Sequence, residues 1–424
     1  MTKNQKIIIA IAIGVVFLFS LLLIVGRRPP QSSVAQLSFW GLEQETPAWN
    51  ALIGAYSTLH PRTRITYTGF DEDVYEKTLL DNMAAGTGPD VFIFRNDWFT
   101  KHKNKIVSAP ADLISPATVT EKFPAVVSSD FVDGGAVWGL PLSIDTLALI
   151  YNVGLFDASG VASPQSNWDE VQRWIPRLRR IEGGILTRAS VSLGGSEKSV
   201  ANSADILRLL MLQHGARLTD LDYQRATFNS SSGLEASEFY MKFSNKQNIS
   251  YAWEESFDNS LKSFADGKTA AVFAYFSQIP QIKAMNPGVR IGILPAPQFD
   301  IDQPVNYAKY WALTASNATK SRGTAWDFIT FAALNSGPAG EYLKIAGNPP
   351  ALRELIARYQ TNPTLKVFAL QSLSAQSWRN PDHTEVARAW DKMLLSFLSD
   401  RASIQRALSL AAEEVTKLIT SRPR

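Results

Sequence analysis

A polar and aromatic cluster follows a short apolar run near residue 95. The stretch Ala84–Phe99 reads AAGTGPDVFIFRNDWF, in which Pro89 ends a helix and Asp90–Phe94 is predicted to form a buried strand. The four residues after that strand are Arg95, Asn96, Asp97 and Trp98. Ligands of open α/β sheets bind beyond the carboxyl ends of the strands. The cluster therefore predicts a ligand loop, although an ordinary surface loop after a core strand would give the same pattern.

Residues with catalytic potential are few. Glu254, Glu255 and Asp258 could supply the paired carboxylates of a glycosidase. On the helix predicted over Glu254–Ala265, however, Glu254 and Asp258 are neighbours four residues apart, as on a solvated face. The chain has no cysteine and no G-x-S-x-G motif. The histidines have no metal-ligand spacing and are predicted to be surface or capping residues: His60, His102, His214 and His383. We therefore expect no catalytic residue, no metal and no cofactor, and we expect that the protein is not an enzyme.

The amino terminus predicts a membrane anchor. Ile7–Gly26 contains 20 residues without a charge, which is enough to cross a bilayer as a helix. Two lysines precede this segment, and the sequence Arg-Arg-Pro-Pro stands after it in place of a small-residue cleavage site. We expect an uncleaved signal anchor over residues 1–28 and a short tether over 29–36. Because basic residues flank both ends, the charges do not settle the orientation.

The body of the chain is nearly neutral. The net charge is +3, and the first 28 residues carry four positive charges and no negative one, which leaves −1 for the rest. A nucleic-acid-binding protein needs a basic surface, so no nucleic acid is expected as a partner. A chain of 424 residues with 45% apolar residues is long enough for two domains with substantial cores.

Strands and helices alternate in the first hundred residues of the body. Strands are predicted at Leu37–Trp40 and Arg64–Thr68, with helices after each of them, which is the pattern of a doubly wound α/β lobe. The later chain is more helical. Its predicted elements are helices from Asn167 to Arg180, Ser203–His214, Gly233–Asn245 and Ile279–Met285, and strands Ala270–Phe273, Arg290–Leu294 and Tyr310–Ala315. Asn167 and Glu170 have the spacing of a capping box.

Several motifs in order resemble the extracytoplasmic solute-binding proteins of ABC importers, in the sugar-binding family that includes maltose-binding protein. They are FWGLEQE (Phe39–Glu45), GTGPD (Gly86–Asp90), GLP…DT…YN (Gly139–Asn152), SFADGKTAAVF (Ser263–Phe273), ILPAPQ (Ile293–Gln298), AWDFITF (Ala325–Phe331) and ASIQRAL (Ala402–Leu408). The resemblance covers most of the chain from about Leu37 and places the body outside the cytoplasm.

The resemblance implies a two-lobed periplasmic-binding-protein-like fold of class II, in which the lobes close over a ligand by a hinge motion. Lobe 1 is expected to comprise residues 35–143 and 300–347, and lobe 2 residues 144–299 and 348–424. The chain is expected to cross between the lobes near Pro141–Asp145, Pro295–Phe299 and Gly347–Pro350.

The same resemblance implies a set of ligand-binding residues. Acidic positions of the family match Asp97, Glu43 and Asp145, although Asp145 could instead cap a strand end, and Glu43 could be a solvated loop acid. Aromatic rings suit the apolar faces of a sugar, and polar groups suit its hydroxyls. The remaining candidates are Trp40, Trp98, Tyr275, Phe276, Trp311, Trp378 and Arg379, each of which could instead be a packing or surface residue.

The resemblance implies a protein that captures a sugar or oligosaccharide and delivers it to the transmembrane subunits of an ABC permease. Phe94 and Trp98 stand where maltose-binding protein has tryptophan and arginine, so maltodextrin need not be the ligand. The alternatives are a binding protein for a polyamine, glycerol phosphate or peptide, a secreted carbohydrate-active enzyme, and a scaffold that binds only a protein.

Overall fold

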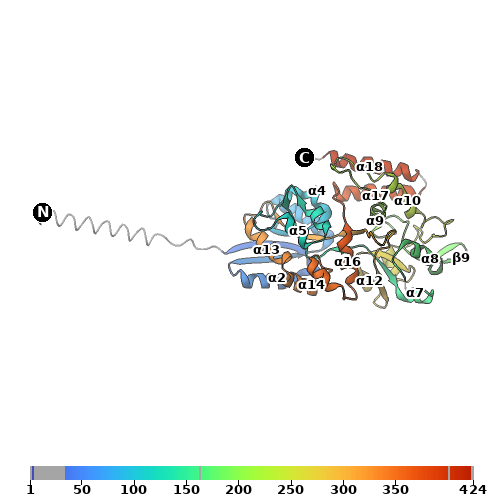
Figure 1. Ribbon diagram of the computed structural model, residues 1–424, viewed down its shortest axis with the longest axis horizontal. Helices are drawn as coiled ribbons and strands as arrows, with labels where there is room; N and C mark the ends of the chain where they lie inside the picture. The colour runs from blue at the N-terminus through green and yellow to red at the C-terminus, as the bar shows by residue number, and fades with distance from the viewer. Residues whose placement is uncertain (1, 4–33, 162–163, 400–401, 422–424) are drawn as a thin grey trace.

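The computed structural model describes residues 2–3, 34–161, 164–399 and 402–421. The predicted anchor segment Ile7–Gly26 lies outside these residues. Among the residues that are described, no helix has the length and apolar character needed to cross a membrane. The described chain forms two halves that lie next to each other along the long axis of the molecule (Figure 1).

The first half, lobe 1, is built on a five-stranded sheet with the strand order β2-β1-β3-β14-β4. Its strands are β1 (Ala35–Leu42), β2 (Thr63–Phe70), β3 (Val91–Arg95), β4 (Ile106–Val107) and β14 (Trp311–Ser316). The buried strand predicted after Pro89 is confirmed, since four consecutive residues of β3 are buried. The sheet is mixed, however: β3 runs parallel to β1 but antiparallel to β14. The reason is that β14 returns from the other lobe and not through a crossover helix.

Helices cover both faces of this sheet, together with a short hairpin. They are α2 (Thr46–Leu59), α3 (Glu72–Ala85), α4 (Phe99–His102), α5 (Pro116–Lys122), α6 (Ala125–Phe131), α13 (Arg322–Leu334), α14 (Ser336–Ala346) and α15 (Arg353–Tyr359), with the hairpin β5 (Val132–Asp133) and β6 (Ala136–Val137). One core cluster joins the sheet to these helices, and its central ring is Phe39, which meets Trp49 edge to face at 4.8 Å between centroids. Helix α3 is followed by Gly86, whose φ of 75° is a left-handed conformation that suits glycine at a helix end.

The second half, lobe 2, has a three-stranded sheet in which β8 lies between β11 and β12. Its elements are β8 (Ala148–Asn152), β9 (Arg180–Glu182), β10 (Ile185–Arg188), β11 (Ala271–Ala274), β12 (Ile291–Leu294), α7 (Val153–Ala158), α8 (Trp168–Leu178), α9 (Ser203–Gln213), α10 (Ser231–Met241), α11 (Ser260–Ala265), α12 (Ile279–Met285), α16 (Lys366–Gln371), α17 (His383–Leu398) and α18 (Ile404–Thr420). Side chains alternate across β8: Leu149 packs in one core cluster, and Ala148 and Ile150 pack in another. Both faces of this sheet are therefore covered.

A small sheet of crossing strands lies between the lobes. Strand β13 (Asn306–Lys309) pairs on one side with β7 (Asp145–Thr146) and on the other with β15 (Ala375–Gln376). Along β13, Tyr307 packs in the lobe 2 cluster and Ala308 in the lobe 1 cluster. The chain thus passes between the cores about ten residues after the expected crossing at Pro295–Phe299. Leu352 and Leu355, beyond the expected crossing at Gly347–Pro350, still pack with lobe 1.

Most predicted helices and strands are confirmed within a few residues, and one is not. The helix predicted from Glu254 begins only at Ser260. Upstream of it, Glu255 accepts hydrogen bonds from the Ser196 amide (3.0 Å) and the Ser199 hydroxyl (2.7 Å). Glu254 pairs with Lys246 at 2.6 Å. These partners hold Glu254 and Glu255 in a loop before α11. Glu254 and Asp258 are therefore not neighbours on one helix face.

The capping prediction at Asn167 is half right. The Asn167 side chain accepts the Glu170 amide at 2.8 Å and caps α8. The Glu170 carboxylate forms a salt bridge with Arg173 instead of completing the capping box. Helix α8 ends at Leu178, two residues before the predicted end.

Candidate functional site

The loop after β3 is held by an ion pair within itself. Arg95 donates to both oxygens of Asp97, from Nε at 2.6 Å and from Nη2 at 3.1 Å. Burial raises the pKa of Asp97, but the charges of Arg95 and Lys309 outweigh it, so the pKa lies below its usual value. Because Arg95 already occupies both carboxylate oxygens, Asp97 acts first as the partner of this arginine.

Trp98 lies in the core of lobe 1. It is only 2% exposed and packs edge to face on Trp311 at 5.2 Å between centroids, with Tyr75 stacked at 6.2 Å. Trp311 is half-buried, and its ring is the part of this aromatic group that reaches the space between the lobes. The loop tryptophan therefore supports the tryptophan that lines the cavity.

A buried carboxylate ties this loop to the crossing strands. Asp130, 1% exposed, accepts hydrogen bonds from Asn96 Nδ2 (3.1 Å), the Tyr310 hydroxyl (2.7 Å) and the Ser377 hydroxyl. Burial raises its pKa to about 6, against the lowering effect of these hydrogen bonds. The Asn96 amide donates to the Tyr310 carbonyl, and the Tyr310 amide donates to Asn96 Oδ1, so one acid fixes the loop, the residue before β14 and the chain after β15.

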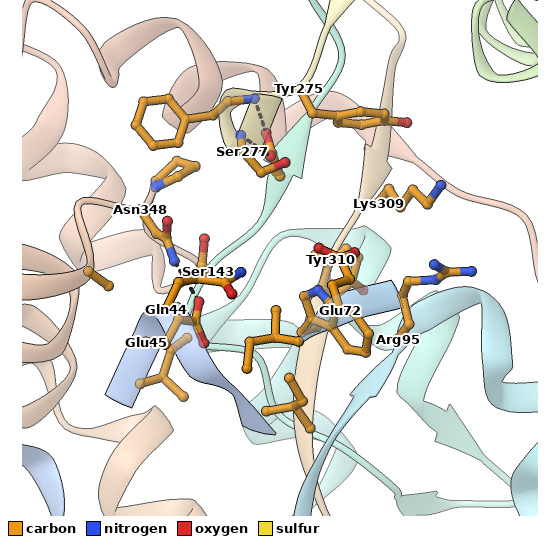
Figure 2. Close-up of a pocket in the computed structure, with 18 of the residues that line it drawn as sticks. Gln44, Glu45, Glu72, Arg95, Ser143, Tyr275, Ser277, Lys309, Tyr310 and Asn348 are labelled. Atoms are coloured by element: carbon orange, nitrogen blue, oxygen red, sulfur yellow. Dashed lines mark hydrogen bonds between the residues drawn. The ribbon is translucent and has the colours of Figure 1, made fainter. Parts of the chain in front are cut away.

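A cavity of about 750 Å³ lies between the lobes (Figure 2). Its walls come from lobe 1, from the crossing segments and from lobe 2, and they combine rings with acids and amides. The residues in these walls include Glu45, Asn348, Arg95, Asp145, Tyr275, Phe276, Lys309 and Trp311. Ligand pockets in proteins typically have volumes of about 300–1,000 Å³, so this cavity can hold a small molecule.

Two carboxylates of this cavity hold its walls in place. Asp145 accepts the amides of Phe276 (2.8 Å) and Ser277 (2.9 Å), and burial raises its pKa to about 6. It thereby caps the 3-10 turn Phe276–Gln278 and joins crossing strand β7 to lobe 2. On the lobe 1 side, Glu45 accepts from Asn348 Nδ2 at 2.9 Å and from Trp49, and burial raises its pKa.

A second cavity, of about 450 Å³, adjoins the first. Arg95, Asn202 and Lys309 line both cavities. A second ion pair lies here in lobe 2, where Arg208 Nη1 donates to Asp205 Oδ1 at 2.6 Å. The Tyr275 hydroxyl donates to Asp205 Oδ2 at 2.9 Å.

The structure brings six of the ten predicted ligand residues to these cavities. Asp145, Tyr275, Phe276 and Trp311 line the larger one, and Asp97 and Trp378 line the smaller one. Their role as ligand contacts stays a prediction.

The other four predicted residues line neither cavity: Glu43, Trp40, Trp98 and Arg379. Trp40 packs on Phe70 at 4.7 Å between centroids, and Glu43 is exposed on the 3-10 turn Glu43–Glu45. Arg379 donates to Asp133 at 3.1 Å and to the Val132 carbonyl at 2.9 Å, in lobe 1. These four side chains therefore contact other protein groups or solvent in this structure, and not either cavity.

Several residues that shape the site carried little signal in the sequence. Lys309 is a lone lysine next to a predicted strand, and Asn348 lies just after a helix. Glu45 is two residues from the predicted Glu43 in the same motif, FWGLEQE, and a second acid in that motif could have indicated it.

A histidine cluster joins the lobes beside the smaller cavity. Glu76 on α3 accepts from His102 Nε2 (2.9 Å) and from His383 Nε2 (2.8 Å) at the start of α17, and Lys101 lies 3.2 Å from Asp382. The prediction of a surface or capping role is wrong for His102, which is buried. The described residues contain no group of three or more acids and histidines that could hold a metal ion.

Comparisons with known proteins agree with this architecture. A family model described as bacterial extracellular solute-binding protein matches residues 40–337. A Brucella abortus (strain 2308) protein named "Putative binding protein" is 21% identical over 290 residues, which cover 67% of this chain and 68% of that protein.

Two solved structures share the fold. The cyclic alpha-maltosyl-1,6-maltose binding protein from Arthrobacter globiformis aligns with a TM-score of 0.76 and 19% identity, over 92% of this chain and all of that one. A cyclo/maltodextrin-binding protein complexed with maltotetraose aligns with a TM-score of 0.77 and 18% identity, over 92% of this chain and 98% of that one. At this identity the likeness establishes the two-lobed fold.

Proposed function

Because the chain belongs to the bacterial extracellular solute-binding protein family, we propose that it captures a sugar or oligosaccharide between its lobes and delivers it to an ABC permease. It acts as a binding protein and not as an enzyme. Its body lies on the extracytoplasmic side of the cell membrane, held by a single N-terminal anchor over residues 1–28 and a tether over 29–36.

The observation that carries this proposal is the composition of the larger cavity. Trp311 from a lobe 1 strand faces a space that Tyr275 and Phe276 of lobe 2 also line. Aromatic rings pack well against the C–H faces of a sugar, while side-chain amides and carboxylates such as those of Asn348 and Glu45 can bind its hydroxyls. Solved relatives with the same fold include a protein complexed with maltotetraose.

The lobes that close over the ligand are proposed as residues 35–143 with 300–347, and 144–299 with 348–424. The exceptions to these limits include Tyr307, whose side chain packs in the lobe 2 core, and Leu352 and Leu355, whose side chains pack in the lobe 1 core. Wall groups from both lobes and from the crossing strands line the cavity, so a ligand there would contact both halves at once. Such a ligand favours the closed arrangement because it binds that arrangement more tightly.

The test is a binding screen of the purified full-length chain in mild detergent against neutral and charged sugars. A ligand that binds only the folded protein raises the melting temperature, and calorimetry then gives its affinity. Trp311→Leu is expected to weaken binding about tenfold or more by removing the ring. Trp138→Leu is the matched control, because Trp138 is a half-buried lobe 1 tryptophan outside both cavities.

Saccharide binding that Trp311→Leu weakens and Trp138→Leu leaves unchanged would support the proposal. Binding of a polyamine or a peptide with no response to any saccharide would contradict the sugar assignment. Turnover of a glycoside would contradict the binding role altogether.

A further inference from the structure

The charged groups between the lobes are arranged unevenly. The larger cavity has Glu45, Glu72, Asp73 and Asp145 in its walls, with two cations, Arg95 and Lys309. The smaller cavity has four cations and three carboxylates, namely Arg95, Arg208, Lys309 and Arg388, with Asp97, Glu197 and Asp205. Lys309 and Arg95 thus mark the boundary between an acidic and a basic compartment.

The carboxylates of the basic compartment already have partners. Asp97 is bound by Arg95 through both oxygens. Asp205 accepts from Arg208 and from Tyr275, one on each oxygen. Glu197 accepts the Ala204 amide at 2.8 Å, and burial raises its pKa. A ligand that enters this compartment therefore meets acids whose hydrogen bonds are already made.

Among the four cations, Arg95, Arg208 and Arg388 each have a close acid partner, which for Arg388 is Glu385 at 2.5 Å, and Lys309 does not. Lys309 Nζ has one anionic neighbour, Asp205 Oδ2 at 3.8 Å, which is beyond hydrogen-bond distance. The same carboxylate already pairs with Arg208, so two cations share one acid. Arg208 is 9% exposed, and its Nε has no hydrogen-bond partner. Lys309, whose side chain is 38% exposed, is therefore the cation of this group that an acid of a ligand can reach without displacing a closer partner.

Lys309 also has the right position to reach a ligand in the larger cavity. It lies on crossing strand β13, its side chain is 38% exposed, and it lines both cavities. In Figure 2 the polar ends of Lys309, Arg95 and Tyr275 point to the same side, away from the pair Glu45 and Asn348. A ligand between the lobes can thus place one end among the acids and amides and the other end beside Lys309.

We infer that Lys309 binds an acidic group of the ligand, and that the ligand is a sugar that carries a carboxylate, such as a uronic acid unit of an oligosaccharide. This inference rests on the proposed sugar-binding function. One lysine without a close acid partner matches one carboxylate. A phosphate ester carries about −1.5 to −2 at neutral pH, which exceeds the charge available.

The test compares sugars that differ only at carbon 6. The full-length chain is titrated by calorimetry with glucose against glucuronate, galactose against galacturonate, and the corresponding disaccharides, with glucose 6-phosphate as the phosphate arm. At least one uronate is expected to bind ten times or more tightly than its neutral partner. Its affinity should fall as salt is raised, because part of Lys309 is exposed to solvent.

Three variants assign the effect to the lysine. Lys309→Met keeps the apolar stem and should reduce uronate affinity at least tenfold, while changing the affinity for the neutral sugar less than threefold. Lys309→Arg keeps the charge and should retain most of the affinity. Lys344→Met is the matched control, since Lys344 is 77% exposed on α14 and lines neither cavity.

The outcomes separate the two proposals. Equal binding of neutral sugar and uronate, unchanged in Lys309→Met, would overturn the inference and leave the sugar-binding function standing. Tighter binding of the phosphate than of the uronate would overturn the assignment of a carboxylate. If no sugar of either kind binds, both the inference and the proposed function fail.

Discussion

The buried carboxylate Asp130 should make the protein less stable as pH rises from 4 to 7. Its neighbours are the neutral donors Asn96, Tyr310 and Ser377, and the nearest cation is Arg379, which pairs with Asp133. Burial raises the pKa of Asp130 to about 6, from an ordinary value of 3.8. At about 1.4 kcal/mol per pKa unit, this difference corresponds to about 3 kcal/mol.

The sign follows from which state holds the proton. Below pH 3.8 the carboxyl is protonated in the folded and the unfolded chain, and the stability linked to the proton is fully present. Between pH 3.8 and 6 the unfolded chain loses the proton while the folded protein keeps it. As pH rises through 6 the folded protein must ionise a buried group, and that stability is lost.

Asp130→Asn removes this titration while keeping the size of the side chain. The difference in unfolding free energy between the wild-type protein and this variant is expected to be about 2.4 kcal/mol larger at pH 4 than at pH 7, because at pH 4 the unfolded chain has already begun to lose the proton. The assay is urea denaturation at half-unit pH steps, followed by tryptophan fluorescence and by circular dichroism. Agreement of the two probes tests whether a single transition is being followed.

Asp133→Asn is the internal control for this experiment. Lys103 and Arg379 outweigh the effect of burial on Asp133 and hold its pKa below the usual value. Its contribution to stability is therefore present above pH 3.8 and is lost as pH falls, which is the opposite sign. Identical pH profiles for the wild-type protein and Asp130→Asn between pH 4 and 7 would refute the reasoning.

Two further substitutions test other contacts of the site. Asp97→Ala should destabilise the unliganded protein by about 3 kcal/mol in urea denaturation, because it leaves Arg95 buried without its partner. The control is Asp81→Ala, at an exposed position of α3, which should cost about 0.5 kcal/mol or less. Equal losses of stability for the two variants would contradict the role given to the Arg95–Asp97 ion pair. Glu76→Gln removes the charge that binds His102 within lobe 1 and His383 of lobe 2. The variant should lower stability by about 2 kcal/mol. It should also increase the radius of gyration in small-angle scattering, because the contact between the lobes is weakened. Glu341→Gln, on an exposed face of α14, is the control, and an unchanged radius in Glu76→Gln would exclude a latch between the lobes.

The sequence predicted elements well where local chemistry decides the conformation. Helix α12 begins at Ile279 with Pro280 in its first turn, and Asn167 caps α8 as expected from its position. The prediction failed at Glu254 because the side chains of Glu254 and Glu255 bind partners outside their own segment, including Ser196, 59 residues away from Glu255. No local pattern encodes such a contact.

The site was predictable in its location but not in its internal pairing. The loop at Arg95–Trp98 does lie at the edge of a cavity, yet the sequence did not show that Arg95 would occupy both oxygens of Asp97. Lys309 was missed because a single lysine beside a strand has no distinctive spacing. Its importance arises only when two ion pairs, one from each lobe, are brought to either side of it.

The position of β14 has a consequence for the order in which the protein can fold. This strand lies between β3 and β4 in the lobe 1 sheet, but it is encoded at Trp311–Ser316, after most of lobe 2. A growing chain that has just reached residue 300 therefore exposes one edge of β3, an apolar strand with unpaired backbone groups, and such edges invite pairing with other chains. The lobe 1 sheet cannot be completed during synthesis until the ribosome has passed residue 316.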